Sequence, residues 1–218
     1  MNKTWLVAGT AAVIVVAFVA GTLLFRDRSK QVVAQAAQTN NDALVRAHSP
    51  VYGNPAAKVT IVEFFDPSCE ACRAFYPVVK GIVNASFSQV RLVVRYAPLH
   101  RGSDRAVKIL EAARQQGKYW EALEKTLEAQ PQWAAHDNPN PEMIWELIAS
   151  TGLDVAKARS AADSPEVDQA LKQDVADMKA LQVNRTPSFF VNGTPLLDFG
   201  VAQLKALVDQ EIKKPRAP

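Results

Sequence analysis

Two segments of the chain have the apolar pattern of buried strands. Residues 58–65 are rich in β-branched and aromatic side chains and follow a turn-like segment at 52–55. Both faces of this segment are apolar, as in a central strand of a covered sheet, and residues 90–96 form the next strand. Between them an apolar helical stripe begins near Cys69 and continues past Pro77, which we expect to kink the helix without ending it. The order strand, helix, strand predicts a parallel pair with a right-handed crossover.

The region between residues 98 and 186 has helical periodicity and no convincing strand. The expected helices are 103–117 with Ser103 as N-cap, one that stops at Pro131, 140–152 with Asn140 as cap and Pro141 first, a short one from about 154, and the longest opening at Ser164. Residues 187–191 and 194–197 then flank Asn192-Gly193, a strong signal for a two-residue hairpin. A last helix covers 201–212, so the pattern as a whole predicts an α/β fold.

The N-terminal segment from Trp5 to Phe25 is apolar or small and uncharged, long enough to cross a bilayer as a helix. A cleaved signal peptide is the alternative, but the apolar run is long for one, and the nearest small-x-small site, Ala34-Gln35-Ala36, lies beyond the charges at 26–30. We therefore expect an uncleaved anchor. Residues 31–42 read as a continuation of the helix that frays into a polar tether.

The charge pattern bears on orientation and on partners. The net charge of +3 comes from the first thirty residues, and the rest of the chain is balanced, which argues against a nucleic-acid surface. Arg26, Arg28 and Lys30 outnumber Lys3, so the positive-inside tendency would place the following residues in the cytoplasm. A lone Cys-x-x-Cys pair suits an oxidising compartment, and we place the globular part outside the cytoplasm on that ground.

The only two cysteines, Cys69 and Cys72, are separated by two residues at the start of the first helix after the anchor. A thiol at a helix N-terminus faces unpaired N–H groups and the positive end of the helix dipole, so its thiolate is favoured. Zinc would need two further ligands, and His48, His100 and His136 are far apart in the sequence. A Cu(I) site needs fewer ligands and stays an alternative. A purely structural disulfide is disfavoured, because so short a loop removes little chain entropy.

Three segments together carry a family resemblance: VEFFDPSCEAC at 62–72, Pro98-Leu99-His100, and RTPSFFVNG at 185–193. With them the chain closely resembles the DsbA-like family of bacterial disulfide-bond proteins. The resemblance implies a thioredoxin-like α/β fold with a large all-helical insertion at about 101–181, within a domain at 58–213. An N-terminal transmembrane helix in residues 1–26 and a tether at 27–57 would precede that domain.

The resemblance also implies roles for individual residues. Cys69 would be the attacking cysteine that forms mixed disulfides, and Cys72 the buried resolving one. Pro187 would be the family's cis-proline, and the backbone of Thr186 would pair with an extended substrate segment. No organic cofactor is implied beyond the redox-active cysteine pair.

Glu63 places a carboxylate in the middle of an apolar strand, which costs several kcal/mol unless it is paired or neutral. We interpret it as a proton acceptor or donor for Cys72, with a carboxylate satisfied by Lys58 as the alternative. His100 has no visible partner, so we interpret it as a hydrogen-bonding loop residue rather than a catalyst.

The dipeptide Glu70-Ala71 between the cysteines departs from the most oxidising family members, in which a histidine there helps to hold the thiolate. Glu70 adds a like charge beside the sulfur and should raise the pKa of Cys69. The disulfide should then be less oxidising.

These observations together predict a membrane-tethered thiol:disulfide oxidoreductase of the bacterial inner membrane, single-pass, with its globular part periplasmic and monomeric. Its partners would be cysteine-containing extracytoplasmic proteins and a membrane redox partner of unknown identity. The alternatives are a thioredoxin-fold copper-binding or metal-resistance protein and a non-catalytic holdase.

Overall fold

The computed structural model describes the backbone of residues 3–215 and the side chains of residues 14–25 and 27–215. At its centre is a five-stranded sheet in the order β1, β3, β2, β4, β5. The strands are β1 (Val51–Gly53), β2 (Val59–Phe65), β3 (Val90–Tyr96), β4 (Ser188–Val191) and β5 (Thr194–Pro195). β2 pairs in parallel with β3 and antiparallel with β4, so it lies in the middle of the sheet, as its two apolar faces require.

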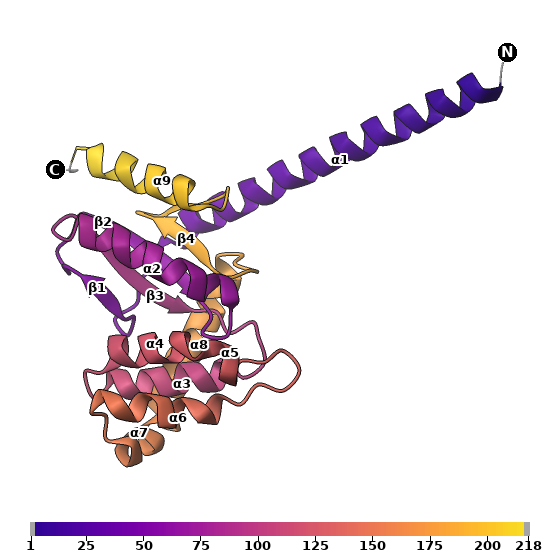
Figure 1. Cartoon of the computed structure of the whole chain (residues 1–218). Helices are drawn as coiled ribbons and strands as arrows, with labels where there is room; N and C mark the ends of the chain where they lie inside the picture. Colours follow the sequence, from indigo (N-terminus) through magenta and orange to yellow (C-terminus); the bar gives the residue numbers. More distant parts are fainter. Residues whose placement is uncertain (1–2, 216–218) are drawn as a thin grey trace.

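The helices surround this sheet (Figure 1). They are α1 (Lys3–Thr39), α2 (Glu70–Ala85), α3 (Ser103–Arg114), α4 (Tyr119–Glu128), α5 (Gln130–Trp133), α6 (Ile144–Ile148), α7 (Val155–Ala162), α8 (Pro165–Ala180) and α9 (Val201–Lys213), with 3-10 turns η1 (Asn41–Ala43), η2 (Pro141–Met143) and η3 (Ala149–Thr151). α2 and α9 pack on the face to which β2 turns Ile61 and Phe65. α8 and the end of α1 cover the opposite face, where Val62 and Phe64 lie.

The helices between β3 and β4 form a bundle beside the sheet, below it in the view of Figure 1. α3 is the central helix of this bundle and contacts α4, α6, α7 and α8. Its stripe of Ala106, Val107, Leu110 and Ala113 is fully buried, as the sequence pattern predicts. The predicted α/β class with helices inserted between the strands is confirmed.

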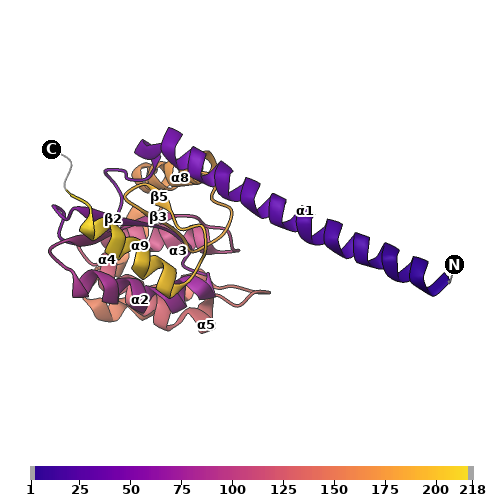
Figure 2. The same cartoon turned by 90° about the horizontal axis from the view of Figure 1, so that it is seen from above.

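α1 is one continuous helix that runs away from the rest of the molecule (Figure 2). Its last turns pack against the sheet, where Ala37 is buried, and Lys30 pairs with Asp198 at 2.7 Å. The expected polar tether at 31–42 is therefore helical as far as Thr39 and docked on the sheet rather than frayed. The predicted membrane span covers residues 5–25, and the side chains of residues 5–13 lie outside the part of the chain that the structure describes. Across the described residues, no helix combines the length and the apolar character that crossing a membrane requires. The anchor and the domain boundaries stay predictions.

Several predicted elements are confirmed and others differ for identifiable reasons. The hairpin forms at Asn192-Gly193, with both residues at positive φ, and Ser164 caps α8 by accepting a hydrogen bond from the backbone of Val167. Ser103 does not cap α3, because its hydroxyl bonds to Asp66 and Gly102 occupies the cap position instead.

Two helix boundaries and one strand also differ from the sequence expectations. The helix expected to stop at Pro131 ends at Glu128, and Pro131 lies in the first turn of the short α5, where proline is tolerated. Asn140 makes no side-chain cap, and only a 3-10 turn follows it before α6 begins. The turn-like segment near Tyr52 contributes a short edge strand, β1, which pairs antiparallel with β3.

Candidate active site

The two cysteines lie at the start of α2, at the end of the loop that leaves β2. Cys69 is the N-cap residue of α2, and its backbone N–H donates to the carbonyl of Asp66 at 3.1 Å. Cys72 lies one turn further along the helix and is completely buried. Both are free thiols in the structure. The helix therefore presents one sulfur at its tip and keeps the other beneath it.

The environment of Cys69 favours its thiolate. A hydrogen bond from the Cys72 thiol is the largest influence and lowers the pKa of Cys69, while burial raises it. The Thr186 side chain and the backbone N–H groups of Cys72 and Ala71 lower it further, and the pKa falls to about 5. At neutral pH this sulfur is an anion and a nucleophile.

The environment of Cys72 has the opposite effect. Burial raises the pKa of Cys72 well above its ordinary value, and the hydrogen bond to Cys69 and the negative charges of Glu63 and Cys69 raise it further. A backbone hydrogen bond from Asp66 opposes these effects without overcoming them. Cys72 therefore keeps its proton at neutral pH, and the two thiols of one motif differ strongly in acidity.

The loop before β4 lies against these sulfurs. The Thr186–Pro187 peptide bond is cis, as the family resemblance implies, and the Cys69 Sγ lies 3.3 Å from the Thr186 carbonyl oxygen, to which Cys69 donates when it is protonated. The Thr186 hydroxyl is buried without another hydrogen-bond partner among the described residues, so it is free to donate to a thiolate. Residues 117 positions apart in the chain are thus brought together at the site.

Glu63 is buried in the middle of β2, 1 % exposed. Its position in the alternation of β2 places it on the same face as Ile61 and Phe65, beneath α2. Burial raises its pKa to about 8, and the negative charge of Cys69 adds to the rise. Its Oε1 has no hydrogen-bond partner among the described residues, while Lys58 donates to the carbonyl of Lys214 at 3.1 Å. Lys58 therefore does not pair with Glu63. With a pKa of about 8, the Glu63 carboxyl is mostly protonated at pH 7 and ionises when the pH rises by about one unit.

The dipeptide Glu70-Ala71 sits at the tip of α2. The Glu70 side chain is 72 % exposed, and its Oε1 lies 3.7 Å from Nε2 of His136. From the sequence we expect Glu70 to raise the pKa of Cys69, yet that pKa is low, because the hydrogen bonds around the sulfur outweigh the opposing effects. The contribution of Glu70 itself stays a prediction.

Two residues that sequence analysis did not single out hold the cysteine loop in place. The buried Asp66 carboxylate accepts hydrogen bonds from the backbone N–H of Ser68 at 2.9 Å and from Nδ1 of His100 at 2.7 Å. From α5, the buried Gln130 donates through Nε2 to the carbonyls of Pro67 at 2.7 Å and Cys69 at 3.0 Å. Asp66 lies within a motif that the sequence displays, but nothing in the sequence pattern connects Gln130 with residue 69.

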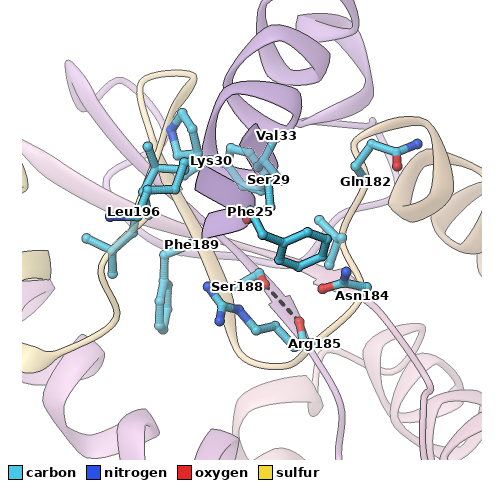
Figure 3. A pocket seen from close by; sticks show the side chains of 14 residues that line it. Phe25, Ser29, Lys30, Val33, Gln182, Asn184, Arg185, Ser188, Phe189 and Leu196 are labelled. Carbon is cyan, nitrogen blue, oxygen red and sulfur yellow. Dashed lines mark hydrogen bonds between the residues drawn. The ribbon is translucent and has the colours of Figure 1, made fainter. Parts of the chain in front are cut away.

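The described part of the chain contains no group of three His, Cys, Asp or Glu side chains placed to hold a metal ion. A cavity of about 280 Å³ lies behind the Thr186–Pro187 loop, between α1 and the β4–β5 hairpin. Figure 3 shows Phe25 from α1 facing Arg185 and Asn184 across it, with the Ser188 hydroxyl bonded to the Arg185 carbonyl at 2.8 Å. Neither cysteine lines this cavity, so the thiol chemistry lies outside it.

Comparison with known proteins gives two kinds of likeness. The chain is similar to the Na(+)/H(+) antiporter NhaA 3 of Salinispora tropica, 31% identical over 146 residues that make up 66% of this chain and 21% of the antiporter. The chain thus spans about a fifth of the length of that curated relative. Among solved structures it is similar to a thioredoxin-like oxidoreductase from Silicibacter pomeroyi DSS-3, with 35% identity, coverage of 81% of this chain and 99% of that one, and a TM-score of 0.69.

The fold is shared more widely. The thiol-disulfide exchange protein alpha-DsbA2 from Wolbachia pipientis is 20% identical, with 83% of this chain and 96% of that chain covered and a TM-score of 0.68. The family model described as thioredoxin matches residues 46–210, from the lead-in to β1 through most of α9. The cysteine pair, the buried acid and the cis-proline loop all lie within that match, and the chain belongs to the thioredoxin family.

Proposed function

We propose that this protein is a thiol:disulfide oxidoreductase of the DsbA-like kind, exchanging disulfides with cysteine-containing proteins through a mixed disulfide on Cys69. The observation that carries the proposal is the opposite effect of one site on its two thiols. The pKa of Cys69 is lowered to about 5, while that of Cys72 is raised well above its ordinary value. A metal site or a passive binding surface does not require two thiols of different acidity. An exchange reaction uses the acidic thiol as nucleophile and leaving group and keeps the other thiol protonated until the mixed disulfide is resolved.

When the protein acts as an oxidant, the reaction consists of two thiol–disulfide exchange steps. A substrate thiolate attacks the Cys69 sulfur of the Cys69–Cys72 disulfide, the bond between the two cysteines breaks, and Cys72 leaves as a thiolate that takes up a proton. A second substrate thiolate then attacks the substrate sulfur of the mixed disulfide, and Cys69 leaves as a thiolate. Two electrons pass from the substrate dithiol to the protein disulfide. The low pKa of Cys69 makes it the good leaving group that this step needs.

In this proposal Glu63 gives a proton to Cys72, or takes one from it, in each cycle. Its carboxyl is buried on the same side of the sheet as Cys72, and the pKa of Glu63 is raised to about 8 by burial and by the Cys69 charge. When Cys69 is in a mixed disulfide that charge is absent, so Glu63 ionises more readily at the moment when Cys72 must lose its proton. Substrate would lie along the Thr186–Pro187 loop, with the backbone of Thr186 pairing with an extended segment.

The proposed protein is anchored in a membrane and works with a second redox protein. Residues 5–25 would anchor the chain once through a bacterial inner membrane, with residues 58–213 as a monomeric periplasmic domain. A membrane redox partner would restore the oxidation state of the cysteine pair, and no organic cofactor would be needed. The antiporter activity belongs by name to a relative of which this chain covers a fifth, and it forms no part of the proposal.

A stoichiometric oxidation assay tests this function. The fully oxidised protein is mixed with a reduced peptide that carries two cysteines, and the peptide disulfide is quantified by mass spectrometry together with the free thiols of the protein. We expect one peptide disulfide for each protein disulfide lost, and none with the Cys69→Ser variant. Peptide binding without electron transfer would indicate a holdase, and tight Cu(I) binding by the reduced protein without exchange would indicate a metal-handling protein.

A further inference from the structure

His100 has a partner that its sequence context does not reveal. It lies in the loop between β3 and α3, and both its backbone N–H and its Nδ1 bond to Oδ2 of Asp66, at 3.0 Å and 2.7 Å. Because that carboxylate oxygen is an acceptor, Nδ1 carries a proton and the imidazole is held in one orientation. His100 is therefore a fixed side chain, although it is 41 % exposed.

Asp66 joins this loop to the loop that carries the nucleophile. Its backbone carbonyl accepts the N–H of Cys69 at 3.1 Å, and its carboxylate also accepts from the N–H of Leu99 at 2.7 Å and from the hydroxyl of Ser103. The Ser103 hydroxyl in turn bonds to that of Ser68 at 2.8 Å. A completely buried carboxylate with this many donors fixes the position of residue 100 relative to residue 69.

The charges around the imidazole are mainly negative. Asp66 faces it from the β2–α2 loop, and the Cys69 thiolate and Glu70 act on it from the tip of α2. The neighbouring Arg101 donates instead to the carbonyl of Asp137, at 3.1 Å. Partial burial lowers the pKa of His100, but the hydrogen bond and charge of Asp66 and the charges of Cys69 and Glu70 outweigh it, so the pKa is raised.

We propose that His100, which Asp66 holds in the loop adjoining the cysteine loop, is protonated when Cys69 is a thiolate and stabilises that thiolate from outside the Cys-x-x-Cys motif. This inference rests on the proposed exchange function and identifies a residue that tunes it. The dipeptide between the cysteines holds no cation, since it is Glu70-Ala71, and the positive charge is supplied from the β3–α3 loop instead. Asp66 acts as a positioning residue, and His100 acts on the reacting sulfur through its charge.

Charge coupling of this kind is reciprocal, and reciprocity gives a sharp test. If the imidazolium lowers the pKa of Cys69, then the thiolate must raise the pKa of His100 by the same amount. The imidazole of His100 should therefore titrate at higher pH in the reduced protein, in which Cys69 is a thiolate, than in the oxidised protein, in which the disulfide is neutral. A histidine that serves only to hold the loop would titrate alike in both.

The experiment combines two measurements on the full chain. The pKa of Cys69 is read from thiolate absorbance in wild type, His100→Gln and His100→Lys, and the pKa of each histidine is read by NMR in both redox states. The control variant is His48→Gln, which alters a histidine bonded to another buried carboxylate, Asp174, at 2.6 Å. We expect His100→Gln to raise the Cys69 pKa by roughly half a unit to one unit. His100→Lys should keep it low, and His48→Gln should leave it unchanged.

The same His100→Gln variant should be a weaker oxidant, with its glutathione equilibrium shifted several-fold toward the disulfide. An unchanged Cys69 pKa in His100→Gln would overturn the proposal. So would an equal rise in His100→Lys, or a His100 pKa that is identical in the two redox states. None of these readouts needs turnover, so a protein that fails to oxidise peptides would refute the proposed function and leave this inference to be decided separately.

Discussion

The chemistry of the site depends on single residues whose surroundings differ over very short distances. Cys69 and Cys72 are one helical turn apart, yet hydrogen bonds lower the pKa of the first and burial raises that of the second. Glu63 adds a buried acid with a pKa of about 8 on the same side of the sheet. The surroundings of each side chain, and not its residue type alone, therefore determine which step of the proposed exchange it can perform.

Glu63→Gln should slow the resolution of the mixed disulfide near neutral pH, because it removes the proposed proton acceptor for Cys72 and keeps the volume of the side chain. Single-turnover kinetics with a model disulfide between pH 6 and 9 measure this rate. The wild-type rate should rise with pH and level off above about pH 8 as Glu63 becomes ionised, whereas the variant should be slower near neutral pH and rise throughout the range, because only direct deprotonation of Cys72 supplies its thiolate. Equal rates for the two proteins across this range would make Glu63 a structural residue.

Glu70→His should lower the pKa of Cys69, since it replaces a like charge by a group that can donate a hydrogen bond or carry positive charge. One pKa unit corresponds to about 1.4 kcal/mol and, for a two-electron couple, to about 30 mV. Glu70 is largely exposed, so we expect a more oxidising disulfide by a few tens of millivolts at most. Thiolate absorbance and glutathione titration provide the measurement, and Glu70→Gln separates the lost charge from the added imidazole. A pKa that does not fall would show that Glu70 points away from the sulfur.

At the scale of elements, the inserted helices take part in the site. α5 is only four residues long, and its buried Gln130 bonds to two carbonyls of the cysteine loop. α1 also does more than lead into the domain, because its last turns pack on the sheet next to the Thr186–Pro187 loop. The bundle thus holds the cysteine loop, and the N-terminal helix packs close to the segment that leads into the Thr186–Pro187 loop.

Gln130→Ala should destabilise the fold, because it leaves the buried Pro67 carbonyl without its donor, while the Cys69 carbonyl keeps only the N–H of Arg73. An unsatisfied buried group costs about 1–3 kcal/mol, so we expect a loss of about 1–3 kcal/mol in the free energy of unfolding. Denaturant unfolding of the reduced protein measures this loss. Gln132→Ala, on the exposed side of the same short helix, is the matched control and should change stability by less than about 0.5 kcal/mol. A similar stability for the two variants would show that the Gln130 bonds do not hold the loop.

The local sequence pattern predicts helices, strands and turns that form between neighbouring residues. It does not predict contacts between residues that are far apart in the sequence. The strands at β2 and β3, the hairpin at Asn192-Gly193 and the cap at Ser164 follow from local propensity, and all are confirmed. Ser103 has the signature of a helix cap, but a partner 37 positions away takes its hydroxyl. The parts played by Asp66 and Gln130 likewise depend on tertiary packing, which no single-sequence pattern records.

For the whole molecule, burial of Glu63 links stability to pH. Its folded pKa of about 8 lies above its ordinary value of 4.5, so the stability associated with this group is complete below about pH 4.5 and is lost as pH rises through 8.

Glu63→Gln removes this dependence and should be more stable than wild type at pH 9 by a few kcal/mol, with a much smaller difference at pH 4. Denaturant unfolding of the oxidised proteins at both pH values tests this, because no thiol titrates in them. A stability difference that is the same at pH 4 and pH 9 would contradict the assignment of a raised pKa to Glu63.

In the proposed reaction Cys69 is the sulfur that exchanges with substrate and Cys72 is the one that resolves the mixed disulfide. The most direct test compares Cys72→Ser and Cys69→Ser, each mixed with a model disulfide peptide at pH 7, with the covalent adducts identified by mass spectrometry after acid quenching. We expect Cys72→Ser to accumulate a mixed disulfide with the peptide at Cys69 within seconds to minutes, whereas Cys69→Ser should form almost none, because its remaining thiol is buried and protonated. Faster or equal adduct formation at Cys72 in the Cys69→Ser variant would contradict this assignment.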